Sequence, residues 1–353
     1  MESGVWCTSV GHNNKRINKV ITSQINKITH TGFCYAHPQI DETAKKILEI
    51  TNFENGKCEF LCSGSEAVEY GMQIARGMSM KPMALTFSES YFGAYGDAAV
   101  KDPKRWYNYN RLDCFCSNPN GCTGDCRKFN DIPFEKIGIF LFEPGSSMGL
   151  VRFPSQKLID KIIRRIKENN GIVVVNEITT GIGRTGKWFG YQHYGINPDI
   201  IAIGKGIGNG YPVSVTAVSE RIVSRSGFKG CFYSQSHQND PLGAVVANEV
   251  ISIITEKKLI QKSRENGKYL KKALKSIDKN KNIIKEVRGR GLMIAIEFKH
   301  SAKEVYEALL KQKIIVARRA PDEVIRLDPA LTVGKKTLDI FVKELAEIVS
   351  KNF

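Results

Sequence analysis

The chain has 353 residues, of which 42% are hydrophobic and 25% are charged. These proportions are ordinary for a folded globular protein and exclude a disordered, collagen-like or coiled-coil chain. The longest apolar runs, such as residues 137–142 and 172–175, are far shorter than the ~20 residues that a membrane span needs. Because the first residues also lack the basic patch and apolar core of a signal peptide, we expect a cytoplasmic protein with no membrane association.

The net charge is +16, from 52 lysines and arginines against 36 aspartates and glutamates. Such an excess is compatible with nucleic-acid binding. However, the basic residues are mixed with acidic ones along helix-like stretches such as 256–275, without a basic arm or a stripe interleaved with aromatic residues. We therefore expect no nucleic-acid partner, but a lysine-rich surface that suits small anionic molecules.

Short apolar segments alternate with helical patterns from about residue 50 to residue 240. This alternation predicts a mostly parallel sheet with crossover helices on its faces. One such helix is expected at 155–167, where leucine and isoleucine recur at helical spacing. The predicted strands are residues 59–63, 83–87, 137–142, 172–176, 200–204 and 213–218.

After Pro241 the pattern changes to that of a smaller α+β domain. Its predicted elements are a long helix at 241–255 and 259–277, a strand pair at 286–290 and 292–298, a helix at 302–312, a strand at 324–327 and a last helix at 336–351. We divide the chain into an N-terminal segment that packs with this small domain, a large domain, and a C-terminal small domain that includes the interdomain helix. These parts are residues 1–45, 46–240 and 241–353.

Polar, glycine or aromatic residues follow five of the predicted strands, where parallel sheets bind ligands. Gly64 and Ser65 open a helix after the first strand, which suits a phosphate; a plain capped helix with Ser65 as its N-cap is the alternative. Lys205 directly follows another strand and precedes a glycine-rich loop. Burial there depresses the pKa of a lysine and makes the amine a nucleophile.

Residues 176–206, which begin Asn-Glu-Ile-Thr-Thr-Gly-Ile-Gly-Arg-Thr-Gly and end Gly-Lys-Gly, closely resemble the class III aminotransferases. Further matches to that family are at residues 63–67, 143–144, 236–242, 288–293 and 324–331. The resemblance covers nearly the whole chain. It implies an enzyme that uses pyridoxal phosphate (PLP) and has the fold type I of PLP-dependent transferases. That fold is α/β, with a large, mostly parallel-sheet domain that has helices on both faces and a small α+β domain. The resemblance also implies an obligate homodimer with two active sites at its interface.

The resemblance assigns cofactor roles to several residues. Lys205 would form the Schiff base with the cofactor and carry the proton during the reaction. Gly64 and Ser65 would cup the phosphate. Ser236, where the family usually has threonine, would reach the phosphate from the partner subunit.

Other residues would surround the cofactor ring and the substrate. Tyr91 would stack on one ring face and Ile178 would pack on the other. Thr179, which is usually glutamine in the family, would lie near the ring hydroxyl. Glu143 would shape the substrate side, and Arg326 would bind the substrate α-carboxylate through two hydrogen bonds.

Asn176 stands where the family has an aspartate that pairs with the pyridine nitrogen of the cofactor. A carboxylate keeps that nitrogen protonated through a bond worth about 1.5–3 kcal/mol, against about 0.5–1.5 kcal/mol for a neutral amide. Glu177 cannot substitute, because strand alternation points it to the other face. We therefore expect a weaker electron sink, which leaves slower transamination, racemisation or an inactive relative as alternatives.

Three further departures concern the substrate. Ala94 replaces an arginine of acetylornithine-type members, which argues against acetylornithine as the substrate. Met148 replaces a glutamate that masks the carboxylate-binding arginine in ornithine-type members, so we expect Arg326 to be unmasked. The sequence also starts later than is usual in the family, so either its start is misassigned or the substrate pocket is more open.

Nine cysteines are present, an odd number, and no secretory context favours a disulfide framework. Four thiols suit zinc or an iron–sulfur cluster, but their spacing is uncommon and a reduced thiol-rich loop is the preferred interpretation. These four are Cys114, Cys116, Cys122 and Cys126. We interpret His193 and His237 as structural.

The predicted function is transfer of an amino group from an amino acid or amine to a 2-oxo acid through the Lys205 Schiff base. A PLP-dependent amino-acid racemase or epimerase on the same scaffold, and a non-catalytic PLP-binding relative, are the alternatives. The identities of the amino donor and acceptor stay open.

Overall fold

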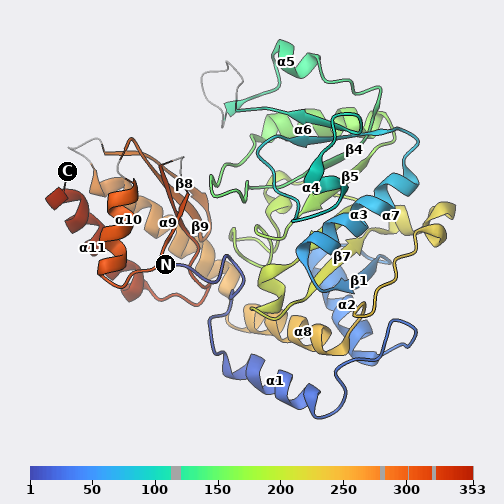
Figure 1. Cartoon of the computed structure of the whole chain (residues 1–353), viewed down its shortest axis with the longest axis horizontal. Helices are drawn as coiled ribbons and strands as arrows, with labels where there is room; N and C mark the ends of the chain where they lie inside the picture. Colours follow the sequence, from blue (N-terminus) through green and yellow to red (C-terminus); the bar gives the residue numbers. More distant parts are fainter. Residues whose placement is uncertain (113–120, 279–282, 301, 320–322, 353) are drawn as a thin grey trace.

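The computed structural model describes residues 1–112, 121–278, 283–300, 302–319 and 323–352 (Figure 1). These residues form a seven-stranded sheet, a four-stranded sheet and the helices that cover them. No described helix is long and apolar enough to cross a membrane.

The large sheet has the strand order β1-β7-β6-β5-β4-β2-β3. Strand β7 runs antiparallel to both of its neighbours, and the other pairs are parallel. The six strands predicted from the apolar segments all form, and a short seventh strand lies at one edge. The strands are β1 (Lys57–Leu61), β2 (Met83–Phe87), β3 (Trp106–Tyr109), β4 (Ile137–Phe142), β5 (Ile172–Asn176), β6 (Ile200–Ile203) and β7 (Ser214–Val218).

Helices cover both faces of the large sheet because its strands are apolar on both sides. In β5, Ile172 and Val174 contact the cluster on one face, while Val173 and Val175 contact the cluster on the other. The first face is covered by α3 (Gly64–Met78), with the short helices α4 (Asp97–Val100) and α7 (Glu220–Val223). The second face is covered by α2 (Pro38–Thr51), α5 (Arg127–Asn130), α6 (Gln156–Glu168) and α8 (Pro241–Glu256).

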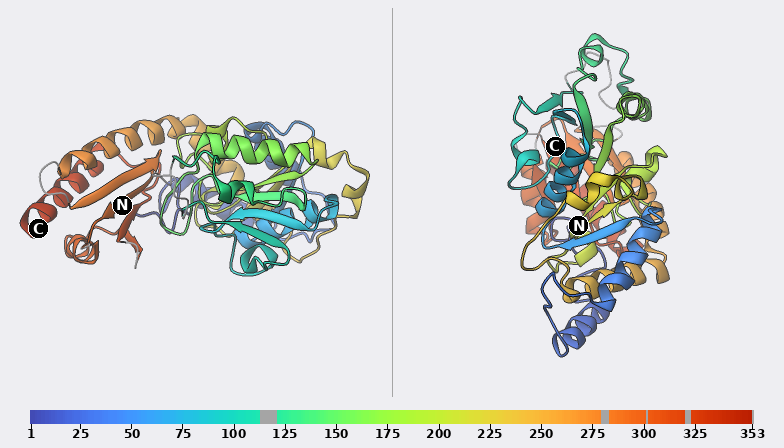
Figure 2. Two further views of the ribbon diagram at one scale, coloured as in Figure 1. Left: turned by 90° about the horizontal axis from the view of Figure 1, so that it is seen from above. Right: turned by 90° about the vertical axis from the view of Figure 1, so that its right-hand side faces the viewer.

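The small sheet is antiparallel, with the order β10-β11-β9-β8. Three helices and one face of this sheet enclose a separate apolar core. Figure 2 shows this unit beside the large sheet at one end of an elongated molecule. Its elements are α9 (Leu259–Ile277), β8 (Ile284–Arg290), β9 (Met293–Phe298), α10 (Ala302–Lys311), β10 (Ala317–Arg319), β11 (Val324–Leu327) and α11 (Lys335–Asn352).

The N-terminal segment contacts two different parts of the molecule. The amino group of Met1 donates to the carbonyl of Ile315 at 2.6 Å, and the Leu331 N–H donates to the carbonyl of Ser9 at 2.8 Å. By contrast, α1 (Lys15–Ile25) and α2 pack against α8. Residues 1–9 therefore lie against the small unit, whereas the following helices lie against the large one. The division of the chain at residues 45 and 240 stays a prediction.

Candidate active site

The carboxyl ends of five strands meet at a pocket of about 130 Å³. Its lining comes from the segments that follow β1, β2, β4, β5 and β6. Residues that lie as far apart in the sequence as Gly64 and Lys205 therefore meet in one pocket. Every cofactor residue predicted from the sequence lines this pocket except Ser236. The lining residues are Gly64, Ser65, Tyr91, Phe92, Gly93, Glu143, Ser147, Asn176, Ile178, Thr179 and Lys205.

The start of α3 forms one wall of the pocket. Ser63, not Ser65, is its N-cap: the Ser63 hydroxyl accepts from the Glu66 N–H at 3.3 Å, and the Glu66 carboxylate accepts from the Ser63 N–H at 2.8 Å. The interpretation of Ser65 as the cap is therefore wrong. Ser65 is left in the first turn, where N–H groups have no acceptor within the helix and attract anions. Glycine is needed at 64, because a Cβ there would lie 3.0 Å from the side chain of Ile178.

Lys205 lies directly after β6, at the start of a 3-10 turn. Its φ of +45° is in the left-handed region, which is uncommon for a residue with a side chain. Burial lowers the pKa of the Lys205 amine, while the charges of Cys7 and Glu143 oppose that shift. A larger share of unprotonated amine is therefore present at neutral pH, which makes this side chain a nucleophile.

Asn176 and Glu177, at the end of β5, point to opposite sides of the sheet. The Asn176 amide donates to the carbonyl of Tyr91 at 2.9 Å, and its oxygen accepts from the Ile178 N–H at 3.1 Å. The buried Glu177 carboxylate accepts from the Thr180 hydroxyl at 2.6 Å and from two N–H groups of the 3-10 helix Gly190–Tyr194. Glu177 therefore holds a loop on the far side and does not line the pocket.

Glu143 follows β4 and is buried at the base of the pocket. Its carboxylate accepts from the Tyr91 N–H at 3.0 Å and from the Ser147 N–H at 3.4 Å. Burial raises the pKa of Glu143 to about 7, although these hydrogen bonds and the charge of Lys205 oppose the shift. Glu143 thus joins the loops after β2 and β4 and can gain or lose a proton near neutral pH.

A second cavity, of about 540 Å³, adjoins the first and shares Tyr91, Ser147, Thr179 and Lys205 with it. Arg326 of β11 lies in its wall, as do Met148 and Trp6.

The orientation of Arg326 is fixed by two contacts. Its guanidinium lies 3.7 Å from the centre of the Trp6 ring, and its Nε donates to Asp328 at 3.0 Å. The buried Asp328 carboxylate also accepts from the backbone N–H of Trp6 at 3.0 Å. Sequence reasoning missed Trp6 and Asp328, because neither partnership follows from a local pattern.

Some predicted residues lie elsewhere. Ser236 is exposed and does not line either cavity of this chain. Cys122 and Cys126 lie close to the hydroxyl of Tyr109, at 3.8 and 4.0 Å. Cys114 and Cys116 lie outside the described residues.

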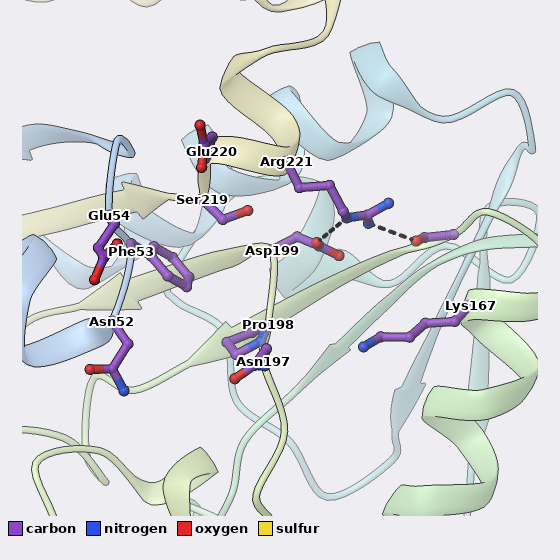
Figure 3. Close-up of a pocket in the computed structure, with 11 residues that line it drawn as sticks. Asn52, Phe53, Glu54, Lys167, Asn197, Pro198, Asp199, Ser219, Glu220 and Arg221 are labelled. Carbon is purple, nitrogen blue, oxygen red and sulfur yellow. Dashed lines mark hydrogen bonds and ion pairs between the residues drawn. The ribbon is translucent and has the colours of Figure 1, made fainter.

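A separate cavity of about 490 Å³ lies at the opposite end of the sheet (Figure 3). It adjoins the amino ends of β5 and β6, where parallel sheets do not place their ligands. One oxygen of Asp199 accepts from the Val173 N–H at 2.8 Å, and the other accepts from Arg221 at 2.6 Å. Because one oxygen accepts from the backbone and the other from the Arg221 side chain, Asp199 is fully engaged in holding the fold, and we interpret this cavity as structural.

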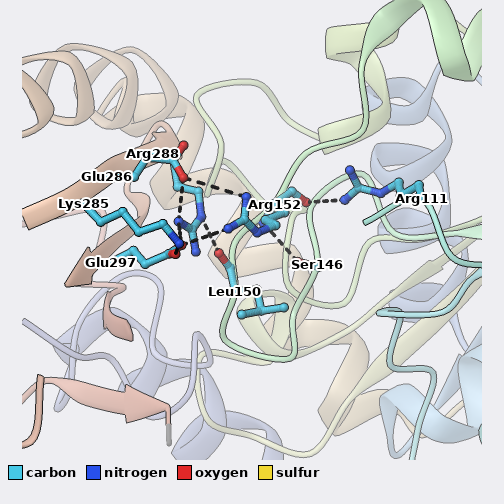
Figure 4. Close-up of polar contacts among 8 residues, drawn as sticks. All are labelled: Arg111, Ser146, Leu150, Arg152, Lys285, Glu286, Arg288 and Glu297. Carbon is cyan, nitrogen blue, oxygen red and sulfur yellow. Dashed lines mark hydrogen bonds and ion pairs between the residues drawn. The ribbon is translucent and has the colours of Figure 1, made fainter. Parts of the chain in front are cut away.

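The loop after β4 is tied to the small sheet by charged groups (Figure 4). Arg152 donates to Glu297 of β9 at 2.9 Å, and Arg288 of β8 donates to the Leu150 carbonyl at 2.7 Å. Arg288 also contacts Glu297, and the Arg152 N–H donates to the Ser146 hydroxyl at 3.0 Å. The segment that carries Ser147 and Met148 is therefore held between the two sheets.

The chain matches the family described as Aminotransferase class-III over residues 1–349. The leucine/methionine racemase of Thermococcus litoralis is 28% identical to it, over 97% of this chain and 84% of the relative. The acetylornithine aminotransferase of Aquifex aeolicus is 29% identical, over 98% of this chain and 91% of the relative. A Bacillus anthracis aminotransferase structure shares the fold with a TM-score of 0.88, at 21% identity over 99% of this chain and 88% of that chain. The chain belongs to the class III aminotransferases, enzymes that use pyridoxal phosphate.

Proposed function

We propose that the 130 Å³ pocket holds pyridoxal phosphate and that an amino acid or amine and a 2-oxo acid exchange an amino group there. The observation that carries this proposal is the meeting of an amine of lowered pKa, Lys205, with the free N–H groups at the start of α3. An aldehyde-bearing phosphate ester needs both groups in one pocket.

The residues present fit this cofactor. Gly64 and Ser65 would hold the phosphate, Lys205 the aldehyde carbon, and Ile178 one ring face. Tyr91 is 44% exposed beside the pocket, so its ring is free to stack on the other face. When bound, the cofactor withdraws electrons from the bonds at the substrate Cα.

The protein itself would bind the substrate and move its proton. Arg326 would hold the α-carboxylate through two parallel N–H bonds, because Asp328 occupies its Nε and Trp6 supports its plane. The Lys205 Nζ would take the proton from the substrate Cα and return it on the same tether. Glu143 would seal the base of the pocket.

We propose that Asn176 makes this chain a variant of its family with a less stabilised carbanion. An amide does not enforce protonation of the pyridine nitrogen as a carboxylate does. In support of this, the Asn176 Nδ2 donates to the Tyr91 carbonyl oxygen. A carboxylate oxygen at the same position would be repelled by the partial negative charge of that carbonyl.

Racemisation is the second candidate. It is favoured by the similarity to a named racemase, at 28% identity over 97% of this chain, and by a base, Lys205, that can serve both directions of proton transfer.

We also propose that the chain acts as a homodimer of two-domain subunits. The loop that carries Ser236 also exposes Phe232, which is 69% accessible, and Tyr35 is 72% accessible. Such side chains suit an interface, through which Ser236 would reach the partner's phosphate. Chromatography with light scattering should give twice the mass of one chain, and a monomer would contradict this.

The test of function is to mix PLP-loaded protein with glutamate, alanine or ornithine and to follow the visible absorbance of the cofactor together with 2-oxo acid release. We expect stoichiometric 2-oxo acid from at least one donor, and none from Lys205→Ala. Loss of chirality without 2-oxo acid would replace transamination by racemisation. Absence of bound cofactor would overturn both.

A further inference from the structure

Two histidines and an aspartate gather outside the active site. Asp240 immediately precedes α8, His237 lies three residues earlier, and His30 comes from the segment between α1 and α2. The His30 Nδ1 lies 2.5 Å from one oxygen of Asp240, and the His237 Nδ1 lies 2.8 Å from the other. The centres of the two imidazole rings are 4.9 Å apart. The three side chains each offer one atom that can bind a metal ion, and these atoms all lie within 4.8 Å of one another.

The position of Asp240 makes this arrangement unusual. An aspartate at the N-cap of a helix ordinarily accepts a hydrogen bond from the first turn. Asp240 is at that position of α8 and makes no such bond; both of its oxygens face imidazoles instead. The positive end of the helix dipole still favours the ionised carboxylate. An anionic ligand is thus presented beside two imidazoles.

The surroundings of the cluster are acidic. Among the described residues, Asp240 forms ion pairs with the two histidines and with no lysine or arginine, in a chain of net charge +16. Glu59 lies next to the same loop, where its carboxylate accepts from Asn239 at 2.7 Å. The Sγ of Cys62 lies 3.9 Å from the His237 carbonyl oxygen. A cation entering this site would therefore meet the Asp240 carboxylate, with that of Glu59 beside the same loop.

The geometry points to a binding site for a divalent transition-metal ion of the zinc class, with His30, His237 and Asp240 as ligands and water at the remaining position. Imidazole nitrogen and carboxylate oxygen are ordinary ligands of such ions at about 2.0–2.2 Å. Ligand atoms around a tetrahedral ion are then roughly 3.3–3.5 Å apart. The two histidine–aspartate contacts need to open by about 1 Å or less, which exposed side chains accommodate.

The ion would join the segment between α1 and α2 to the loop that carries Ser236. This consequence for the active site rests on the proposed function, because Ser236 matters there only if it reaches a partner's cofactor. The metal site itself rests on the three side chains alone.

Cobalt(II) is the probe, because the nine cysteines of this chain can also bind metal. Thiolate ligands give cobalt an intense sulfur-to-metal absorption in the near ultraviolet, whereas imidazole and carboxylate ligands give weak visible bands alone. The reduced full-length protein is titrated with cobalt(II), and the bound ion is then displaced with zinc. We expect one equivalent with weak visible bands.

The variants His30→Ala and His237→Ala should each lower the affinity for cobalt(II) by more than about 100-fold. Loss of even a side chain that only hydrogen-bonds to a metal ligand lowers metal affinity by about 10–100-fold. His300→Ala, which removes another exposed histidine, is the matched control and should bind cobalt as the parent does. Equal affinity in all three variants, or absorption from sulfur ligands alone, would overturn the proposal. The unfolding temperature of each variant is compared with the parent's, so that a loss of folding is distinguished from the loss of a ligand. The titration needs no turnover, so a failure of transamination would leave its result unchanged.

Discussion

Asn176 forms two hydrogen bonds of opposite polarity, one donated to Tyr91 and one accepted from Ile178. An aspartate could make the second bond but not the first. The amide of Asn176 is therefore matched to the backbone groups that it contacts.

Asn176→Asp should lower the free energy of unfolding of cofactor-free protein by about 1–3 kcal/mol, because a carboxylate would face the Tyr91 carbonyl without a shared proton. Urea unfolding of cofactor-free and PLP-loaded protein measures the effect, and the loss should be smaller in the loaded protein. An unchanged cofactor-free stability would show that the amide is not held by Tyr91.

Glu143→Gln tests the pKa of about 7 that burial gives this carboxyl. Since the folded-state pKa lies above the value of about 4.3 in an unfolded chain, the stability linked to this group is fully present below about pH 4.3. It is lost as the pH rises toward 7. The parent should therefore lose stability relative to the variant between pH 5 and pH 8 in urea titrations. A pH-independent difference would contradict the raised pKa.

At the scale of elements, the loop after β4 has two attachments. Its first residues belong to the pocket, and its end is bound to β8 and β9 through Arg152, Arg288 and Glu297. The same loop therefore connects the small sheet to Ser147 and Met148, which line the cavities.

Glu297→Gln should destabilise the protein by about 1.5–3 kcal/mol, because it leaves the largely buried Arg152 and Arg288 with the more exposed Glu286 as their carboxylate partner. It should also raise KM for the amino donor. Lys285→Gln is the control: it removes a partner of the same carboxylate, but that partner is 59% exposed, so the cost should be about 0–1 kcal/mol. Equal losses in both variants would show that the network is a surface feature.

The strands and the pocket could be predicted because they depend on local pattern. A continuous apolar run such as Ile137–Phe142 is buried as a central strand with helices on both faces. The residues that follow parallel strands of this kind lie together at the carboxyl edge of the sheet. Strand β3 was not predicted, since its four residues, Trp106–Tyr109, are too short to show an alternation. The pairing of Arg152 with Glu297 joins residues 145 positions apart, and no pattern along the chain encodes it.

At the scale of the whole molecule, the first eleven residues connect the two units. Trp6 supports Arg326 in the small unit, while the Val10 N–H donates to Asn209, four residues beyond Lys205, at 2.9 Å. One segment therefore contacts both Arg326 and the turn that follows Lys205.

Trp6→Ala should raise KM for the amino donor about 2- to 30-fold, because stacking of Arg326 on the ring contributes about 0.5–2 kcal/mol. Cofactor binding should stay unchanged, since the backbone contact of residue 6 to Asp328 is retained. Steady-state kinetics and the visible absorbance of the cofactor measure the two effects. A fall in kcat at constant KM would contradict this role.

The contact of Trp6 with Arg326 has an optical consequence. The chain contains three tryptophans, of which Trp106 is buried in the large unit and Trp188 packs against its core. The Trp6 indole, by contrast, lies in the wall of the 540 Å³ cavity, 3.7 Å from the guanidinium. A carboxylate that paired with Arg326 would change the electric field at that indole, so tryptophan fluorescence would report the binding of an anion in this cavity without any added label.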